Sequence, residues 1–168
     1  MATSLDAVSK VEKGKLAGLI APEHMLSVVE GRGDELIIAT RTALNILSND
    51  GDGFFIMIEG SQIDWGGHQN NTSYIVTEVS DFDKAIGEAL AFAANDGKTL
   101  VIVTADHETG GFAINGGSLK KGQINGGFTT SDHSAIMVPV FAFGPGAHLF
   151  RGFYDNTDIP KKIMSLLE

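Results

Sequence analysis

Apolar residues recur at helical spacing in two long segments of the chain and in one short segment near its end. Residues 34–47 carry leucine, isoleucine and alanine every three or four positions, and residues 74–95 keep the same period over a longer stretch. Polar residues and glycines at 48–53 and 96–97 end these patterns. A further apolar face covers residues 159–167, so the sequence predicts three helices.

Three other segments are continuously apolar, which is typical of strands buried on both faces of a sheet. They cover residues 54–58, 99–104 and 138–143. The order strand, helix, strand over the first two predicts a right-handed crossover between parallel strands and an α/β fold. Pro139 has no amide hydrogen to donate, which favours an edge or strand-start position.

Residues 110–130 are rich in glycine, asparagine and serine, with a short apolar stretch and the pair Lys120-Lys121. This composition indicates a hairpin with loops. Such a segment could serve as a mobile cover over a site.

The chain has 168 residues, which suggests one domain, and its charge balance restricts its partners. Lysine and arginine total 12 against 21 aspartates and glutamates, a formal net charge of −9. This excess of acid argues against nucleic acids and anionic membranes and favours divalent cations. No apolar run approaches the ~18 residues of a membrane span. Cysteine is absent, so any metal must be bound by aspartate, glutamate or histidine.

The opening residues, Met1 to Ser4, show no basic segment followed by an apolar stretch, so no secretory signal is expected in the chain as given. Two explanations stay open: an intracellular protein, or a piece of a longer one. The second is favoured, because the chemistry-bearing residues resemble half of an active site.

Acids and histidines directly follow the first two predicted strands. Asp64 and His68 are four residues apart, so one turn of helix or a tight loop can bring both to one ion. Asp106 and His107 are adjacent at a strand end, where a bend in the backbone can direct both side chains to a metal. This edge of an open α/β sheet is where ligands bind. His133, shortly before the last strand, is a third candidate.

Each of these motifs alone is ordinary, because an Asp-x-x-x-His pair is usually a surface helix pair or a cap. Together they indicate a metal site, since three of the five histidines lie beside acids at loop positions. Zinc accepts oxygen and nitrogen ligands where thiolates are missing. The remaining histidines, His24 and His148, are expected to be structural or solvent-facing.

These motifs resemble the C-terminal part of the bacterial alkaline phosphatases, over nearly the whole chain. The matching segments are Ile58-Glu59-Gly60-Ser61-Gln62-Ile63-Asp64-Trp65-Gly66-Gly67-His68, Val103-Thr104-Ala105-Asp106-His107-Glu108, His133 and Phe143-Gly144-Pro145. The Asp-Trp-Gly-Gly-His variant resembles the cold-adapted marine and Bacteroidetes-type enzymes, and the shortness of residues 110–130 makes a large lid domain unexpected. The resemblance implies a three-layer α/β sandwich, present in part, with a mostly parallel sheet and helices on both faces.

The resemblance also implies a role for individual residues. The ligand sets would be Asp64, His68 and His133 for a first zinc, Asp106 and His107 for a second zinc, and Glu59 for magnesium. The two zinc ions would stabilise the attacking and leaving oxygens of an in-line displacement at phosphorus. Trp65 follows a zinc ligand, and its ring either packs over loop backbone or tunes the access of phosphate or water.

The family's serine nucleophile lies in an Asp-Ser-Ala context, and this chain has no Asp-Ser pair. No catalytic nucleophile is therefore expected here. The family's phosphate-clamping arginine and remaining magnesium ligands belong to its first half, and Arg32, Arg41 and Arg151 match none of those motifs. We interpret residues 1–168 as the C-terminal part of a single alkaline phosphatase domain without its N-terminal half. The complete parent would be a homodimer, periplasmic or secreted.

The leading hypothesis is metal-dependent hydrolysis of small phosphate monoesters, with the isolated chain inactive or nearly so. One alternative is another enzyme of the same superfamily, such as a phosphoglycerate mutase, a phosphopentomutase or a phosphodiesterase. The other is a non-catalytic metal-binding domain, which would account for the missing nucleophile.

Overall fold

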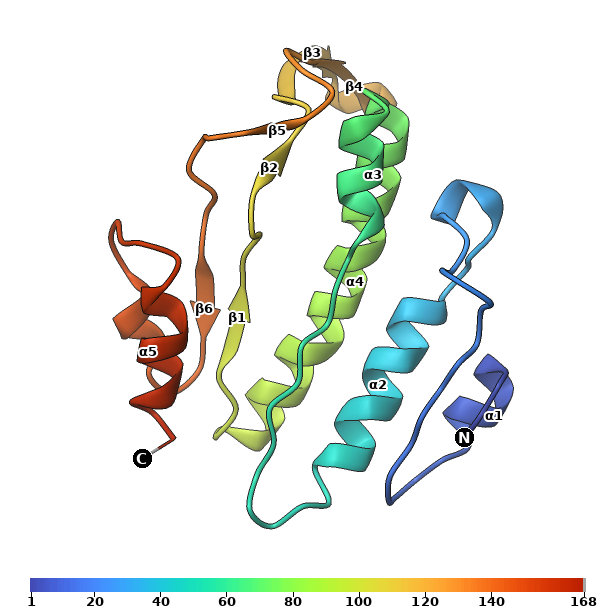
Figure 1. The fold of residues 1–168 in the computed structure, drawn as a ribbon, viewed down its shortest axis with the longest axis vertical. Helices are drawn as coiled ribbons and strands as arrows, with labels where there is room; N and C mark the ends of the chain where they lie inside the picture. Colours follow the sequence, from blue (N-terminus) through green and yellow to red (C-terminus); the bar gives the residue numbers. More distant parts are fainter. Residues whose placement is uncertain (168) are drawn as a thin grey trace.

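Long helices packed beside short strand pairs form the framework of the chain (Figure 1). The structure is a computed structural model that describes residues 1–167. Its α-helices are α1 (Leu5–Ser9), α2 (Glu35–Leu47), α3 (Gln62–His68), α4 (Thr72–Asp96) and α5 (Asp158–Met164). Its strands are β1 (Val101–Val103), β2 (Glu108–Thr109), β3 (Ala113–Ser118), β4 (Gln123–Gly127), β5 (His133–Ser134) and β6 (Phe141–Phe143). Single 3-10 turns are η1 (Val28–Glu30), η2 (Leu119–Lys121) and η3 (Ala147–Phe150).

The ends of α4 follow from its local sequence. The Asn71 side chain caps the N-terminus by accepting a hydrogen bond from the Tyr74 N–H at 3.1 Å. Gly97 ends the helix in the left-handed conformation, with φ 70°, which suits glycine. The helices predicted over residues 34–47 and 74–95 are confirmed as α2 and α4. The last helix starts one residue earlier than predicted and ends at Met164.

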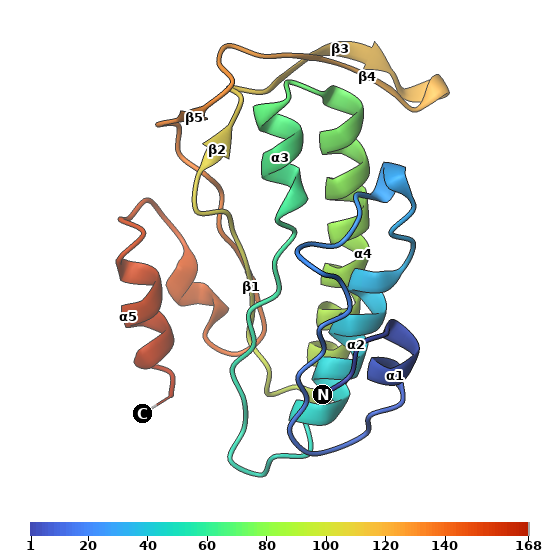
Figure 2. The same cartoon turned by 45° about the vertical axis from the view of Figure 1, so that its right-hand side comes forward.

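The strands β1 and β6 lie between α4 on one side and α5 on the other (Figure 1, Figure 2). β1 contacts α4, while β6 contacts η3, which in turn packs on α5. This order of helix, strand and helix agrees with a partial three-layer α/β sandwich.

The strand pairing differs from the parallel arrangement that the sequence predicts. All three two-stranded sheets among residues 1–167 are antiparallel: β1 with β6, β2 with β5, and β3 with β4. The apolar runs at 99–104 and 138–143 do pair, with Val101 opposite Phe143. Pairing begins only after Pro139, which cannot donate to a ladder. An apolar run predicts a strand, but it carries no information about the direction of its partner.

Residues 54–58 are extended but are not paired as a strand, so the predicted crossover between parallel strands does not appear among residues 1–167. Phe54 packs edge-on against Phe92 of α4, with ring centroids 6.0 Å apart. Phe55 and Met57, on alternate positions, are 65% and 82% exposed. A strand requires a hydrogen-bonded neighbour, and no described residue pairs with this segment.

Residues 110–130 form the predicted hairpin, which extends across the ends of α3 and α4 (Figure 2). β3 and β4 pair with Ala113 opposite Gly127, and a register shift between Ile114 and Gly116 interrupts the ladder. η2 closes the turn. Within residues 1–167, no helix combines the length and the apolar character needed to cross a bilayer.

Candidate metal centre

Helix α3 presents two of the predicted ligands on one face. Asp64 and His68 are one turn apart, and Asp64 Oδ2 lies 3.4 Å from His68 Nε2. The predicted turn of helix at this motif is therefore present. Both side chains are partly open to solvent, with 34% of Asp64 and 40% of His68 exposed.

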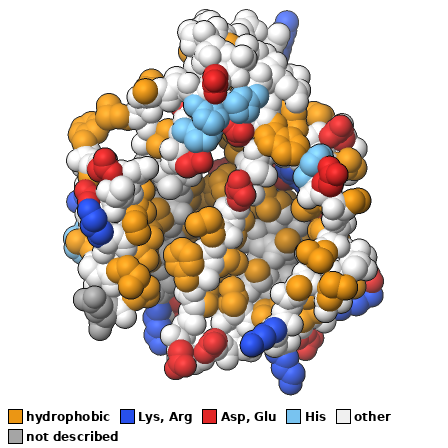
Figure 3. Space-filling view, in the orientation of Figure 1, with side chains coloured by type: hydrophobic (Ala, Val, Ile, Leu, Met, Phe, Trp, Pro, Cys, Tyr) orange, Lys and Arg blue, Asp and Glu red, His pale blue; other side chains and the backbone are white. Residues whose placement is uncertain are grey.

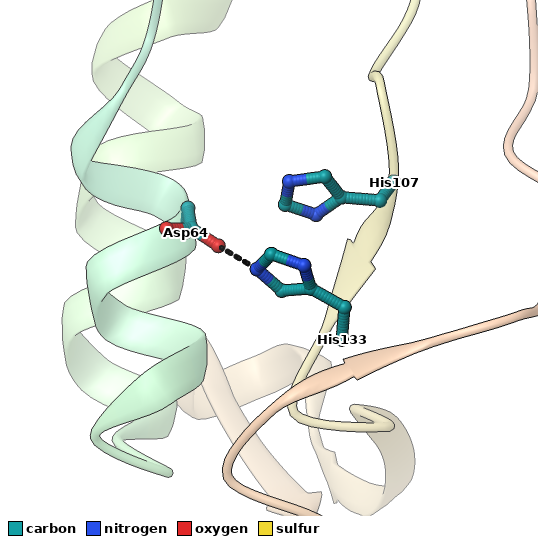
Figure 4. A group of neighbouring side chains, drawn as sticks. All are labelled: Asp64, His107 and His133. Carbon is teal, nitrogen blue, oxygen red and sulfur yellow. Dashed lines mark ion pairs between the residues drawn. The ribbon is translucent and has the colours of Figure 1, made fainter.

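Two further histidines reach the same place from the β2 and β5 pair. His107 immediately precedes β2, and His133 lies opposite Thr109 in the antiparallel register. Their rings stack with centroids 3.6 Å apart and planes inclined by 21°. Figure 4 shows both rings directed from this pair toward Asp64 on α3.

The side-chain atoms that these elements contribute lie close to one another. His133 Nε2 lies 3.6 Å from Asp64 Oδ1 and 3.3 Å from His68 Nε2. Asp64, His107 and His133 each offer an atom within 4.8 Å of the others, and so do His68, Asp132 and His133. Histidines and acids gather on this face just below the hairpin (Figure 3). The structure thus brings Asp64, His68, His107 and His133 together.

The other two predicted ligands are the more exposed Asp106 and Glu59. Asp106 Oδ2 is 3.2 Å from His107 Nε2, but 87% of its side chain is exposed. Glu59 ends the extended segment before α3 and is exposed. Asp106 belongs to neither group of three facing donors found among residues 1–167, and neither does Glu59. Their ligand roles, like those of the four central residues, stay predictions.

The donor set fits a zinc ion, and hydrogen bonds with neighbouring residues orient the side chains of His68 and Asp64. His68 Nδ1 lies 2.8 Å from the Ser131 carbonyl oxygen. A carbonyl only accepts, so the neutral ring carries its hydrogen on Nδ1 and directs the Nε2 lone pair into the cluster. The Thr109 hydroxyl donates to Asp64 Oδ1 at 2.5 Å and lies 3.3 Å from His107 Nδ1. Such outer bonds typically hold metal-binding histidines and carboxylates in place.

Glu108 ties the elements of the site together, a role that the sequence alone did not reveal. Its carboxylate accepts hydrogen bonds from the Gly111 N–H at 3.1 Å, from the Phe112 N–H at 2.8 Å, and from the Ser134 hydroxyl. Partial burial tends to raise the pKa of Glu108, but the bonds from Ser134, Phe112 and Gly111 outweigh it and hold this pKa below its ordinary value. The charged carboxylate therefore fastens β5 and the start of the hairpin to β2.

Glycines let α3 approach its neighbours closely. A Cβ at Gly67 would come within 2.8 Å of Cβ and the carbonyl oxygen of Thr109, and one at Gly66 within 2.9 Å of the Ile75 backbone nitrogen. Both contacts are too short for any larger residue without movement of backbone. The close packing of α3 against Ile75 and Thr109 thus explains why both positions in the Asp-Trp-Gly-Gly-His motif are glycine.

Trp65 is partly buried, and its ring contacts a histidine from a distant segment. The His24 ring meets it edge-on, with centroids 4.7 Å apart and planes at 86°. This segment is fastened to α3 by Gln62, whose side chain donates to the Met25 carbonyl at 2.6 Å and accepts from the Tyr74 hydroxyl at 2.7 Å. His24 and His148 are both exposed, which confirms the expectation of solvent-facing positions.

Arg32 lies outside the metal centre and is already paired. Its guanidinium binds Glu78 at 2.5 Å and Asp81 at 2.9 Å, and all three residues are buried. Arg41 forms an exposed pair with Glu88 at 2.6 Å. The guanidinium of Arg32 therefore has a structural role in holding Glu78 and Asp81.

Comparison with known proteins now identifies the chain. The family model for alkaline phosphatase matches residues 2–125 and 119–168. The chain belongs to the alkaline phosphatase family. Alkaline phosphatase 4 of Bacillus subtilis (strain 168) is 29% identical, and the match covers 99% of this chain and 51% of that protein. Alkaline phosphatase 3 of the same strain is 30% identical over 77% of this chain and 43% of its own length.

Solved alkaline phosphatases share the fold of this chain. The enzyme from the Antarctic bacterium TAB5 has a TM-score of 0.90 and 48% identity, covering 99% of this chain and 51% of that one. The cold-active enzyme of the psychrophile Shewanella sp. also has a TM-score of 0.90, at 29% identity, covering 99% and 58%. A mutant of the TAB5 enzyme was solved with Mg bound in a site termed M3. This alkaline phosphatase chain therefore spans about half the length of the relatives it matches.

Proposed function

We propose that this chain takes part in the metal-dependent hydrolysis of phosphate monoesters and supplies most of the zinc ligands for that reaction. The observation that carries the proposal is the triangle formed by Asp64, His68 and His133. The two imidazole Nε2 atoms lie 3.3 Å apart, and each lies 3.4 to 3.6 Å from one of the two Asp64 oxygens, although the residues come from two elements far apart in the sequence. Carboxylate and imidazole donors at such separations suit a zinc ion with an open fourth position.

The proposed ligand sets keep the assignment that the family resemblance implies. They are Asp64, His68 and His133 for one zinc, Asp106 and His107 for a second zinc, and Glu59 for magnesium. When bound, the two zinc ions supply charge that stabilises the attacking and leaving oxygens at phosphorus. The second set has only two ligands in this chain, so its affinity should be the weaker.

The protein's own residues prepare this site before any ion binds. Thr109 holds one Asp64 oxygen by donating to it. The Ser131 carbonyl fixes the ring of His68. Trp65, next to Asp64 in the chain, is proposed to border the space into which the phosphate enters. Because these groups are placed in advance, binding costs little rearrangement of side chains.

The serine nucleophile, the phosphate-binding arginine and the remaining magnesium ligands are proposed to lie in a preceding half of the same domain. Three observations support this proposal. The chain contains no Asp-Ser pair, Arg32 is buried against two carboxylates, and relatives of this family are about twice as long. The exposed faces of Phe55 and Met57 are a further reason, since such apolar side chains are normally covered.

For the complete parent we propose small phosphomonoesters as substrates, a homodimeric state, and a periplasmic or secreted location. These three proposals rest on the resemblance to the bacterial enzymes. The isolated chain is expected to bind metal better than it catalyses, because nucleophile activation needs residues that it does not contain.

The experiment measures zinc and magnesium binding by calorimetry and hydrolysis of p-nitrophenyl phosphate at alkaline pH. The chain should bind about one zinc ion tightly and turn over substrate near the background rate. His68→Ala should lose the tight zinc, whereas His148→Ala, which removes an exposed histidine of η3, should keep it.

Two outcomes would contradict the proposal. Robust turnover that disappears in His68→Ala would show that the chain needs no preceding half. A complete lack of zinc binding would refute the metal site. The natural reading frame gives a separate test, because an upstream Asp-Ser-Ala segment would support the proposal and a true start at Met1 would favour a non-catalytic metal-binding domain.

A further inference from the structure

Two carboxylates lie near the same pair of imidazoles in the candidate metal centre. Asp64 lies 3.4 Å from His68 and 3.6 Å from His133, through its two oxygens. Asp132 also offers an oxygen within 4.8 Å of the donor atoms of the same two histidines. His68 and His133 can therefore bind a cation together with either acid, and exchange of one carboxylate for the other would move the ion.

The two acids differ in their access to solvent. Asp132, His68 and His133 are all exposed, and we call them the outer group. Asp64 is partly buried and accepts a bond from Thr109. The outer group is therefore the more open to a dissolved cation, whereas a charge–charge interaction is stronger at the less exposed Asp64.

Asp132 is also held in a suitable position. Its Oδ1 accepts a hydrogen bond from the His133 N–H at 2.9 Å, and its own N–H donates to Thr130 Oγ1 at 3.1 Å. His68 Nδ1 keeps its hydrogen and donates it to the Ser131 carbonyl whichever acid is used, so the lone pair of Nε2 faces the ion in both states. No proton needs to move when the carboxylates exchange.

We propose that the outer group of His68, Asp132 and His133 is a docking site where a divalent cation is captured before Asp64 replaces Asp132 as its carboxylate ligand. The inference rests on the proposed zinc site and adds a path by which that site is filled. A docking site of this kind accelerates binding and release equally. It leaves the dissociation constant of the filled site unchanged.

The test follows zinc uptake and release by the chain in a stopped-flow instrument, with a fluorescent zinc indicator as the readout. Asp132→Asn removes the charge but keeps the oxygen that accepts the His133 N–H. Its association and dissociation rate constants should both fall by about fivefold, within the range of effects that one local charge has on cation capture. The dissociation constant should change by less than about twofold.

Two control variants separate this path from other effects. Asp83→Asn removes the same charge from an exposed position of α4 and should leave both rates near those of the unmodified chain. Asp132→Glu restores a carboxylate and should recover most of the rate. Circular dichroism of each variant checks that the fold is retained.

Unchanged rates in Asp132→Asn would overturn the docking site while leaving the proposed zinc site intact. Equal slowing in Asp83→Asn would overturn it too, because net charge alone would then explain the effect. A larger dissociation constant with an unchanged association rate constant would also overturn the docking site, because Asp132 would then act as an ordinary ligand of the final site. Failure of the unmodified chain to bind zinc would refute the proposed function itself, and the docking site with it.

Discussion

The hydroxyl of Thr109 donates to Asp64 Oδ1 over 2.5 Å, and this bond connects the strand β2 to the helix α3. The Thr109 hydroxyl oxygen also lies 3.3 Å from Nδ1 of His107. One side chain thereby orients a proposed ligand of the first zinc and contacts a proposed ligand of the second. The bond depends on close packing, because the backbone of Gly67 rests against Thr109.

Thr109→Val is expected to weaken zinc binding by about tenfold or more, the usual effect of removing an outer hydrogen bond to a ligand. Valine keeps the shape and the methyl group that faces Gly67, so the fold should be preserved. Calorimetric titration with zinc measures the change. Thr109→Ser keeps the hydroxyl and should bind zinc nearly as well as the unmodified chain, and equal affinities for the valine and serine variants would contradict this role.

Arg32→Met is expected to reduce the free energy of unfolding by about 3–5 kcal/mol, because it leaves the carboxylates of Glu78 and Asp81 buried without a partner. Urea unfolding followed by circular dichroism measures this loss. Arg41→Met removes the exposed pair with Glu88 and should cost about 0–1 kcal/mol. Similar losses of unfolding free energy in the two variants would show that burial of Arg32 does not make its ion pairs more important for stability.

Glu108→Gln is expected to lower stability near neutral pH and to have little effect in acid. The pKa of Glu108 is lower in the folded chain than its ordinary value of 4.5, so its charge stabilises the fold above that value. This contribution is lost as the pH falls through the lower pKa of the folded state. The free energy of unfolding of both metal-free chains, measured at about every pH unit between pH 3 and pH 7, shows whether their difference grows toward neutral pH, as expected.

A stability difference between the Glu108→Gln and unmodified chains that grows toward acid would contradict this interpretation. Ser134→Ala removes one of the hydrogen bonds that lower the pKa of Glu108 and should show the same pH dependence with a smaller amplitude.

His24→Ala is expected to shift the fluorescence of Trp65 to longer wavelength, because the ring loses its edge contact and gains exposure to water. Trp65 is the only tryptophan in the chain, so the emission reports this position alone. Zinc affinity should stay within about twofold of the unmodified chain, because His24 contacts Trp65, which is not one of the proposed zinc ligands. His148→Ala should leave the emission unchanged, and an unshifted spectrum for His24→Ala would show that the contact does not shield the ring.

Much of the candidate metal centre could be predicted from the sequence because its signals are local. Asp64 and His68 are one helical turn apart, and Asp106 and His107 follow an apolar run directly, so each pair is visible within a few residues. The approach of His133 to His68 could not be predicted in this way. These residues are 65 positions apart, and only the pairing of β2 with β5 beside α3 brings their Nε2 atoms to 3.3 Å.

The sequence by itself determined the long helices α2 and α4, since apolar spacing, the Asn71 cap and the Gly97 terminus act within a few turns. It also determined which residue types offer metal ligands. Tertiary structure decided how the strands pair, because a hydrogen-bonded ladder needs a partner that an apolar run does not specify. It alone placed Thr109 against Asp64 and Asp132 beside His68, since these contacts arise from the packing of separate elements rather than from their spacing along the chain.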